Sequence, residues 1–160
     1  MFAQVNEQTV VNASRQFWEQ MLSMSMEALP HFGESALSAG HMVGSVALSG
    51  VWKGRIEVRM ATGLAYEATA AMMMQAIDSV VEADALDATK EIANMIAGVI
   101  KSSLPRPCTM TVPESEIGAE GFLKESDCGD CLDVRFRHVS GEFLVRVWEQ
   151  ECIFEPAVCS

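Results

Sequence analysis

Two segments of the chain, one in its first half and one near its end, alternate apolar and charged residues next to a short turn. The first alternates over residues 56–60 and follows the turn Val-Trp-Lys-Gly at 51–54. The second alternates over residues 132–137 and precedes a Ser-Gly turn at 140–141. Because successive side chains of a strand point to opposite faces, this period of two predicts two β-hairpins, each with one buried and one solvent-facing side.

Elsewhere, apolar residues recur at the spacing of an α-helix. Residues 6–26 and a segment that ends near Ser103 share this spacing. Between them, residues 63–75 are predicted to form a short helix rich in Ala and Met. Ser79 and Glu82 have the spacing of a capping box that would open the third helix, and Pro105 stops it. We expect the methionines at 72–74 to pack in the core, because Met fills irregular gaps.

A short strand at 108–112 and an acidic loop at 114–130 connect the third helix to the second hairpin. The predicted fold class is therefore α+β: a largely antiparallel sheet, built from two hairpins and a short strand, packed against helices. At 160 residues and 49% hydrophobic content, residues 1–160 are expected to form a single domain with a proper core.

The charge of the chain limits its partners. Its net charge of −11 opposes binding to nucleic acid or to an anionic membrane surface. No uncharged apolar run is long enough to span a bilayer, and the start lacks the basic and apolar regions of a signal peptide. A cytoplasmic location is expected.

The five cysteines are an odd number in a chain without a secretory signal, which favours reduced thiols. Cys128 and Cys131 form a CxxC, a pattern found in zinc sites and redox pairs. A structural zinc site needs further ligands, and the three histidines lack a suitable spacing. A redox pair belongs at a strand-to-helix junction, whereas this pair lies in an acidic loop before a strand. We interpret it as an incidental pair and predict no metal.

The helix over residues 87–101 carries a narrow polar stripe. At about 100° per residue, five residues fall within roughly 40° of one line along the helix: Asp87, Glu91, Asn94, Gly98 and Lys101. Carboxylates four residues apart repel each other, and glycine inside a helix costs about 1 kcal/mol relative to alanine. Two interpretations follow. The stripe is either a solvated face, on which Gly98 admits another element, or a functional surface.

This stripe resembles the active-site helix of the CheC/CheX/FliY phosphatases, which dephosphorylate the chemotaxis response regulator CheY. The family signature is an acidic residue or Ser, three residues, Glu, two residues and Asn; here it reads Asp87, Glu91 and Asn94. CheC and FliY relatives usually carry two copies of this helix. The first-half helix here has Glu67 but Ala70 where Asn would fall, so the chain is closer to CheX.

The resemblance implies that the protein stimulates hydrolysis of the aspartyl phosphate of a CheY-like receiver domain. Asn94 would position the attacking water, because an amide both donates and accepts hydrogen bonds and carries no charge to repel phosphoryl oxygens. Glu91 would pair with the receiver's lysine, and Asp87, Gly98 and Lys101 are further candidates for partner contact. Mg²⁺ would belong to the receiver, with no cofactor on this protein. By analogy with single-motif relatives, a homodimer is expected.

Other functions stay open at this point. The same helix could dock a receiver domain or another signalling protein without hydrolysing anything, and phosphate release distinguishes these two cases. A thiol-redox or metal protein built on Cys128 and Cys131 is a third interpretation.

The last hairpin also gathers three arginines near one strand face: Arg135, Arg137 and Arg146. This cluster predicts either a grip on a phosphate or acidic partner, or a solvated sheet face balanced by Glu142 and Glu149.

Overall fold

The computed structural model describes residues 5–29, 37, 39–119 and 131–149. Its strands form one seven-stranded sheet in the order β1-β6-β7-β3-β2-β4, in which β5 also pairs with β2. All pairings are antiparallel. The strands are β1 (Glu27–Leu29), β2 (Met42–Gly50), β3 (Gly54–Met60), β4 (Cys108–Met110), β5 (Glu114–Ile117), β6 (Cys131–His138) and β7 (Gly141–Glu149).

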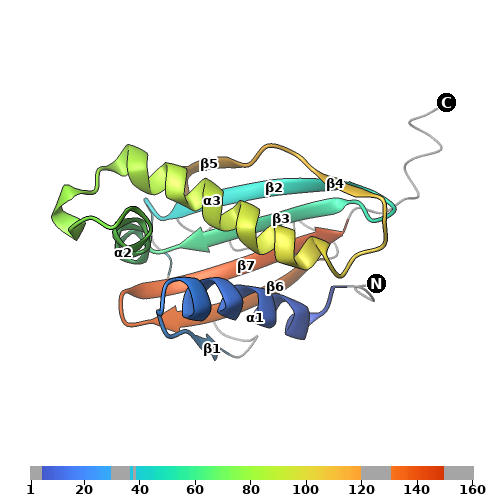
Figure 1. Ribbon diagram of the computed structural model, residues 1–160, viewed down its shortest axis with the longest axis horizontal. Helices are drawn as coiled ribbons and strands as arrows, with labels where there is room; N and C mark the ends of the chain where they lie inside the picture. The colour runs from blue at the N-terminus through green and yellow to red at the C-terminus, as the bar shows by residue number, and fades with distance from the viewer. Residues whose placement is uncertain (1–4, 30–36, 38, 120–130, 150–160) are drawn as a thin grey trace.

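The helices cover one face of this sheet (Figure 1). They are α1 (Glu7–Arg15), its π-helical continuation η1 (Gln16–Met21), α2 (Thr62–Met73), the 3₁₀ turn η2 (Ile77–Ser79) and α3 (Glu82–Lys101). The predicted α+β class and both predicted hairpins, β2–β3 and β6–β7, are confirmed. Within the described ranges, no helix has the length and apolar character needed to cross a membrane.

The core lies between the sheet and these helices. Trp18 of η1 packs edge-to-face on Phe143 of β7, with 5.1 Å between ring centroids. Helix α3 lies across β2 at Gly44, where a Cβ atom would stand 2.6 Å from the Thr89 carbonyl oxygen. Only glycine permits this close approach, so Gly44 fixes how near α3 can lie to the sheet.

The first helix is shorter than predicted. Asn6 caps α1 by accepting a hydrogen bond from the Thr9 backbone N–H at 2.9 Å, but regular α-helix ends at Arg15 and the chain continues as a π-helical turn. Because a π-helical turn holds more residues than an α-helical one, the apolar stripe rotates. Met21, an apolar residue of the predicted helix over residues 6–26, is as a result 57% exposed.

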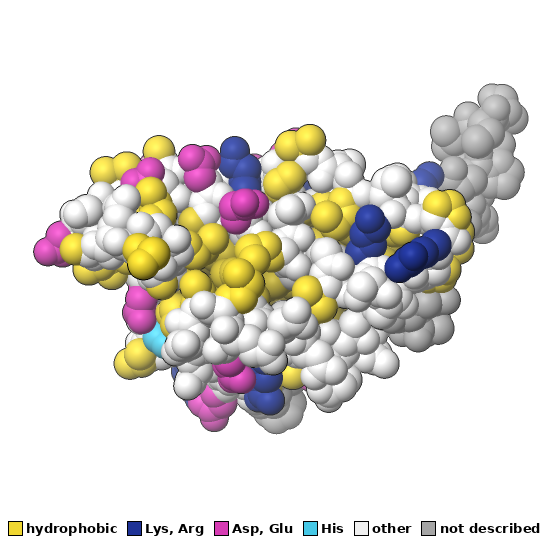
Figure 2. All heavy atoms as spheres, viewed as in Figure 1, with side chains coloured by type: hydrophobic (Ala, Val, Ile, Leu, Met, Phe, Trp, Pro, Cys, Tyr) yellow, Lys and Arg dark blue, Asp and Glu magenta, His cyan; other side chains and the backbone are white. Residues whose placement is uncertain are grey.

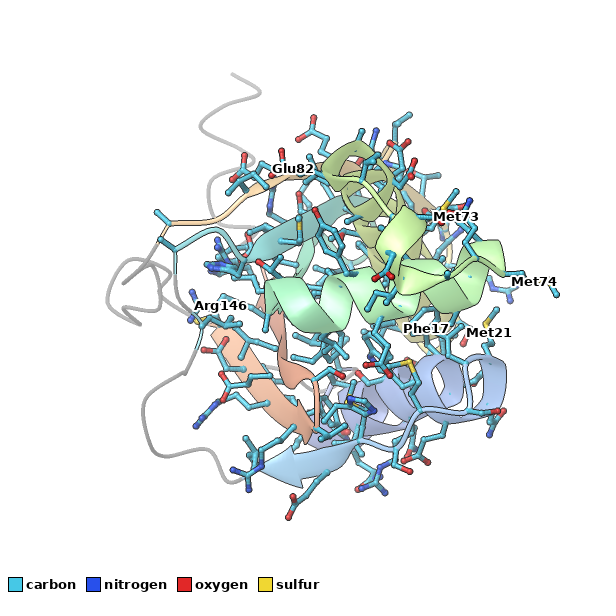
Figure 3. All side chains as sticks on the ribbon, turned by 90° about the vertical axis from the view of Figure 1, so that its left-hand side faces the viewer. Phe17, Met21, Met73, Met74, Glu82 and Arg146 are labelled. Atoms are coloured by element: carbon cyan, nitrogen blue, oxygen red, sulfur yellow. The ribbon has the colours of Figure 1, made fainter. Side chains whose placement is uncertain are left out.

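The methionine run at the C-terminal end of α2 is mostly outside the core, contrary to our expectation. Met72 packs against the core, but Met73 is exposed and Met74 is 93% exposed at the left-handed residue that ends α2. Figure 3 shows Met73 and Met74 at the end of α2, on the same side of the molecule as Met21. These side chains make an apolar surface that periodicity alone did not predict.

The capping box predicted at Ser79 is also wrong by two residues. Ser79 belongs to η2, and the N-cap of α3 is Val81, whose backbone N–H donates to the Asp84 carboxylate at 3.4 Å. Helix α3 ends at Lys101, within two residues of the end predicted near Ser103.

Two edge strands were missed in the sequence. Strand β1 covers the outer edge of β6, and β5 pairs with β2 inside the segment predicted as an acidic loop. Strands of three and four residues are too short to show an alternating pattern. The outer edges of both hairpins are therefore covered by short strands rather than by the N-terminal helix.

The sheet face opposite the helices is not the solvated surface predicted. Glu57, Glu142 and Arg146 are less than 10% exposed. Arg146 binds Asp133 through two hydrogen bonds of 2.6 and 2.7 Å, and it points away from the helices in Figure 3. Arg135 donates to Glu142 at 2.9 Å. Each of these two arginines is paired with a carboxylate of the same sheet, which argues against the predicted grip on a phosphate.

The neighbouring strand β3 repeats this pairing. Arg59 donates to Glu57 at 2.8 Å, and its guanidinium also lies 2.9 Å from the buried His41 ring. Burial lowers the pKa of Arg59, although the hydrogen bond to Glu57 opposes that shift. Polar groups on this side of the sheet therefore serve the fold.

Candidate functional site on helix α3

Helix α3 divides cleanly into an inner and an outer face. Its inner face is buried against the sheet through Ala88, Ile92, Ala93, Ile96 and Ile100. The polar stripe lies on the outer side, where Asp87 and Glu91 are exposed and Asn94, Gly98 and Lys101 are half-buried. The helix and its predicted faces are confirmed, and the five stripe residues are brought together along one accessible line.

The two central side chains of the stripe have no partners among the described residues. Among the residues that the structure describes, neither the Glu91 carboxylate nor the Asn94 amide forms a side-chain hydrogen bond or ion pair. Both groups are therefore available to a ligand. An amide offers two donors and an acceptor without charge, and a carboxylate offers an acceptor for a cation.

Asp87 has a local contact that the sequence analysis did not identify. Its carboxylate lies 3.6 Å from the ammonium group of Lys90, and its side chain is 77% exposed. An exposed pair of this kind contributes little to stability. The i, i+3 spacing of the two residues was the signal that could have revealed it.

Gly98 faces open space rather than another element. No atom lies within 4 Å of where its Cβ would be, leaving aside the backbone of its own helix. This excludes the interpretation that Gly98 admits a neighbouring element from the described part of the chain. Instead, Gly98 borders a surface depression of about 490 Å³, which is lined by Gly98, Lys101, Ser102, Arg106, Pro107, Cys108 and Thr109.

Helix α2 does not carry a second copy of the site. The Glu67 carboxylate accepts a hydrogen bond from the Ser140 hydroxyl in the β6–β7 turn, and Ala70 is buried. The position that corresponds to Asn94 thus has neither an amide nor access to solvent. This agrees with the single motif found in the sequence.

One cysteine of the CxxC lies within the residues that the structure describes. Cys131 is the half-buried first residue of β6, and Cys128 falls outside the described residues. In the part of the chain that is described, no group of three His, Cys, Asp or Glu side chains is placed to hold a metal ion. The proposed role of this pair stays a prediction.

Comparison with known proteins identifies the family of the chain. The family model of the chemotaxis phosphatase CheX matches residues 42–136, a range that includes all of α3. The chain belongs to this family. The family that the motif resembled is thereby confirmed, although no curated protein matches the chain in sequence.

Solved structures of CheX and CheC-like proteins share its fold. Chemotaxis protein CheX from Vibrio vulnificus superposes with a TM-score of 0.72 at 16% identity, over 92% of this chain and 99% of that chain. A CheC-like superfamily protein from a Shewanella species gives 0.74 at 17% identity, covering 90% and 96%. The CheX of Borrelia burgdorferi, solved with CheY, BeF3 and Mg²⁺, gives 0.68 at 19% identity, covering 90% and 97%.

Proposed function

We propose that this CheX family member stimulates hydrolysis of the aspartyl phosphate on a CheY-like receiver domain. Family membership supports a phosphatase, and the Borrelia burgdorferi CheX complex contains CheY with BeF3 and Mg²⁺. The observation that carries the proposal is the outer face of α3, where Glu91 and Asn94 stand without partners within the described chain.

Asn94 positions the attacking water. Hydrolysis of an acyl phosphate requires a water in line with the bond that breaks, while the charge on the phosphoryl oxygens is neutralised. The amide oxygen of Asn94 accepts a hydrogen bond from that water, and the amide nitrogen is able to donate a second hydrogen bond. Because the amide is neutral and is held half-buried on a helix, it brings no repulsion and needs little reorganisation.

Glu91 sets the register of the two proteins. It lies three residues before Asn94 on the same side of the helix, so the two side chains meet adjacent parts of one partner surface. A carboxylate beside the phosphoryl group would repel it, whereas a carboxylate paired with the receiver's lysine holds the partner in place. Asp87 lies one further turn away and shapes the edge of this surface.

The chemistry is divided between two proteins. The receiver supplies the phosphorylated aspartate, the Mg²⁺ that neutralises developing charge, and the lysine; this protein supplies the water-positioning amide and the alignment. No covalent intermediate on this chain is needed. The homodimer expected by analogy stays a prediction, as does the cytoplasmic location.

The test is the decay of a phosphorylated CheY-type receiver domain, with and without this protein. We expect faster decay with the wild-type protein and no acceleration with Asn94→Ala or Glu91→Ala. Unchanged decay with the wild-type protein, despite binding, would make it a docking module instead. Acceleration that survives both substitutions would place the chemistry outside α3.

A further inference from the structure

Two basic side chains that have no partner in the described part of the chain lie at and just after the C-terminal end of α3. Lys101 and Arg106 form no side-chain hydrogen bond or ion pair with any other part of the chain that the structure describes. Every other arginine of the chain makes a side-chain contact: Arg15 with Glu19, Arg55 with Ser45, Arg59 with Glu57, Arg135 with Glu142, Arg137 with Glu27 and Arg146 with Asp133. Arg106 is therefore the arginine that makes no side-chain contact within the described residues.

Both side chains line the depression next to Gly98. The depression also includes Ser102 and Thr109, whose hydroxyl groups add hydrogen-bonding capacity to its wall. Figure 2 shows basic side chains over the C-terminal end of α3 and the connection that follows it. In a chain with a net charge of −11, this is a local concentration of positive charge at one end of the motif helix.

The depression continues the line of the proposed site. Lys101 follows Asn94 by seven residues, which corresponds to about two helical turns and roughly 10 Å along the same side of the helix. Gly98 lies between them, and the space above it is open. A partner whose phosphorylated residue sits at Asn94 can therefore lie flat over Gly98 and reach Lys101 and Arg106.

We propose that this basic depression docks an acidic side-chain cluster on the receiver domain, beside its phosphorylation site. The inference rests on the proposed function for the identity of the partner. A receiver that holds Mg²⁺ does so with carboxylates, so the face around its phosphorylated aspartate is acidic. The net charge of −11 repels a long polyanion such as a nucleic acid. A protein surface with a few carboxylates can contact the basic depression alone.

This contact governs association more than chemistry. Exposed charges at the rim of an interface raise the association rate and make it depend on salt. On the surface that runs from Glu91 to Arg106, Glu91 attracts a lysine at one end, near the middle of α3, and Lys101 with Arg106 attracts carboxylates at the other end, where α3 ends. Opposite charges at the two ends allow only one orientation of the partner along α3, which places its phosphoryl group at Asn94.

The experiment measures binding of a CheY-type receiver domain, held as its beryllofluoride complex with Mg²⁺, to the intact protein. Binding is compared for the wild type, Asn94→Ala and the double variant Lys101→Glu/Arg106→Glu. Arg137→Glu is the control for one charge reversal elsewhere on the protein and is compared with the single variant Arg106→Glu, because Arg137 is 62% exposed on β6 and lies outside the proposed surface. Thermal unfolding of each variant verifies the fold, and Lys101→Gln/Arg106→Gln provides a milder change.

We expect the double reversal to weaken binding about tenfold or more and to flatten its salt dependence, while Arg137→Glu has little effect. Equal binding by the wild type and the double variant would overturn the inference, as would an equal loss with Arg137→Glu. A second outcome would also overturn the inference: the wild type binds millimolar inorganic phosphate, the double variant does not, and both bind the receiver equally. The depression would then take a free anion instead.

The two proposals fail separately in this design. Charge-dependent binding without faster phosphate decay would refute the phosphatase and leave the docking surface standing. Faster decay, with binding that does not change in the Lys101 and Arg106 variants, would support the phosphatase and refute the docking surface. A receiver that does not bind the wild-type protein at all would overturn both.

Discussion

A glycine lies at each face of helix α3, and the two glycines are needed for opposite reasons. On the inner face, the strand residue Gly44 lies against Thr89, and a Cβ there would stand 2.6 Å from a carbonyl oxygen. On the outer face, Gly98 has no atom within 4 Å of its missing Cβ, its own helix backbone apart. The first glycine serves packing within the fold. The second costs the helix stability and leaves room for something outside it.

The polar residues of the molecule show the same contrast. On the far face of the sheet, Asp133 and Arg146 are joined by two short hydrogen bonds. On the outer face of α3, Glu91 and Asn94 find no partner within the described residues. Polar groups that stabilise a fold are paired in it, and polar groups that remain unpaired on a rigid helix are available for another molecule.

The largest expected effect comes from a change of charge at Asn94. The substitution Asn94→Asp keeps the size of the side chain but places a carboxylate beside the phosphoryl oxygens. We expect acceleration of receiver dephosphorylation to fall about 100-fold or more, as loss of a positioned polar group does in other enzymes. Phosphate release from the phosphorylated receiver measures this. An Asn94→Asp protein as active as the wild type would refute the role of a neutral amide.

Next in size is the effect of filling the inner glycine. Gly44→Ala forces a methyl group against Thr89, so we expect a loss of about 2 kcal/mol in the free energy of unfolding. Urea denaturation measures the change. If Gly44→Ala were as stable as the wild type, α3 would not depend on this close approach.

A smaller effect is expected at Glu91. Glu91→Gln keeps the shape of the side chain and removes the charge that pairs with the receiver's lysine. The half-saturating concentration for dephosphorylation should rise about tenfold, with unfolding unchanged. Asp87→Asn is the control, because its carboxylate already pairs with Lys90, and it should alter that concentration much less.

The smallest effect is expected at the outer glycine, with the opposite sign to the inner one. Gly98→Ala should stabilise the protein by about 0.5–1 kcal/mol, because alanine is the better helix former and nothing obstructs the methyl group. The same methyl group should weaken receiver binding. Destabilisation by Gly98→Ala would show that the two glycines do not differ as described.

The periodicity of apolar residues predicted the helices and strands whose pattern lies within one short segment. The alternation at Ile56–Met60 and the 3.6-residue spacing from Ala88 to Ile100 define a buried face on each element, and both elements and their inner faces were predicted correctly. The stripe of α3 could also be predicted, because its residues are neighbours on one helix.

Features that depend on distant parts of the chain could not be predicted. Strands β1 and β5 are too short to show a pattern, and they are defined by their pairing with β6 and β2. The burial of Glu57 and Arg146 depends on three strands meeting in register. Arg106 joins the site only because the chain turns back after α3, so spacing along the helix gave no sign of it.

The most direct test of the account is phosphate release from a phosphorylated CheY-type receiver domain at a saturating concentration of the Asn94→Ala protein, with binding verified in the same sample. The account predicts that the bound receiver loses its phosphate no faster than the receiver alone, while the wild-type protein accelerates the loss. Release at the wild-type rate from the Asn94→Ala complex would contradict it.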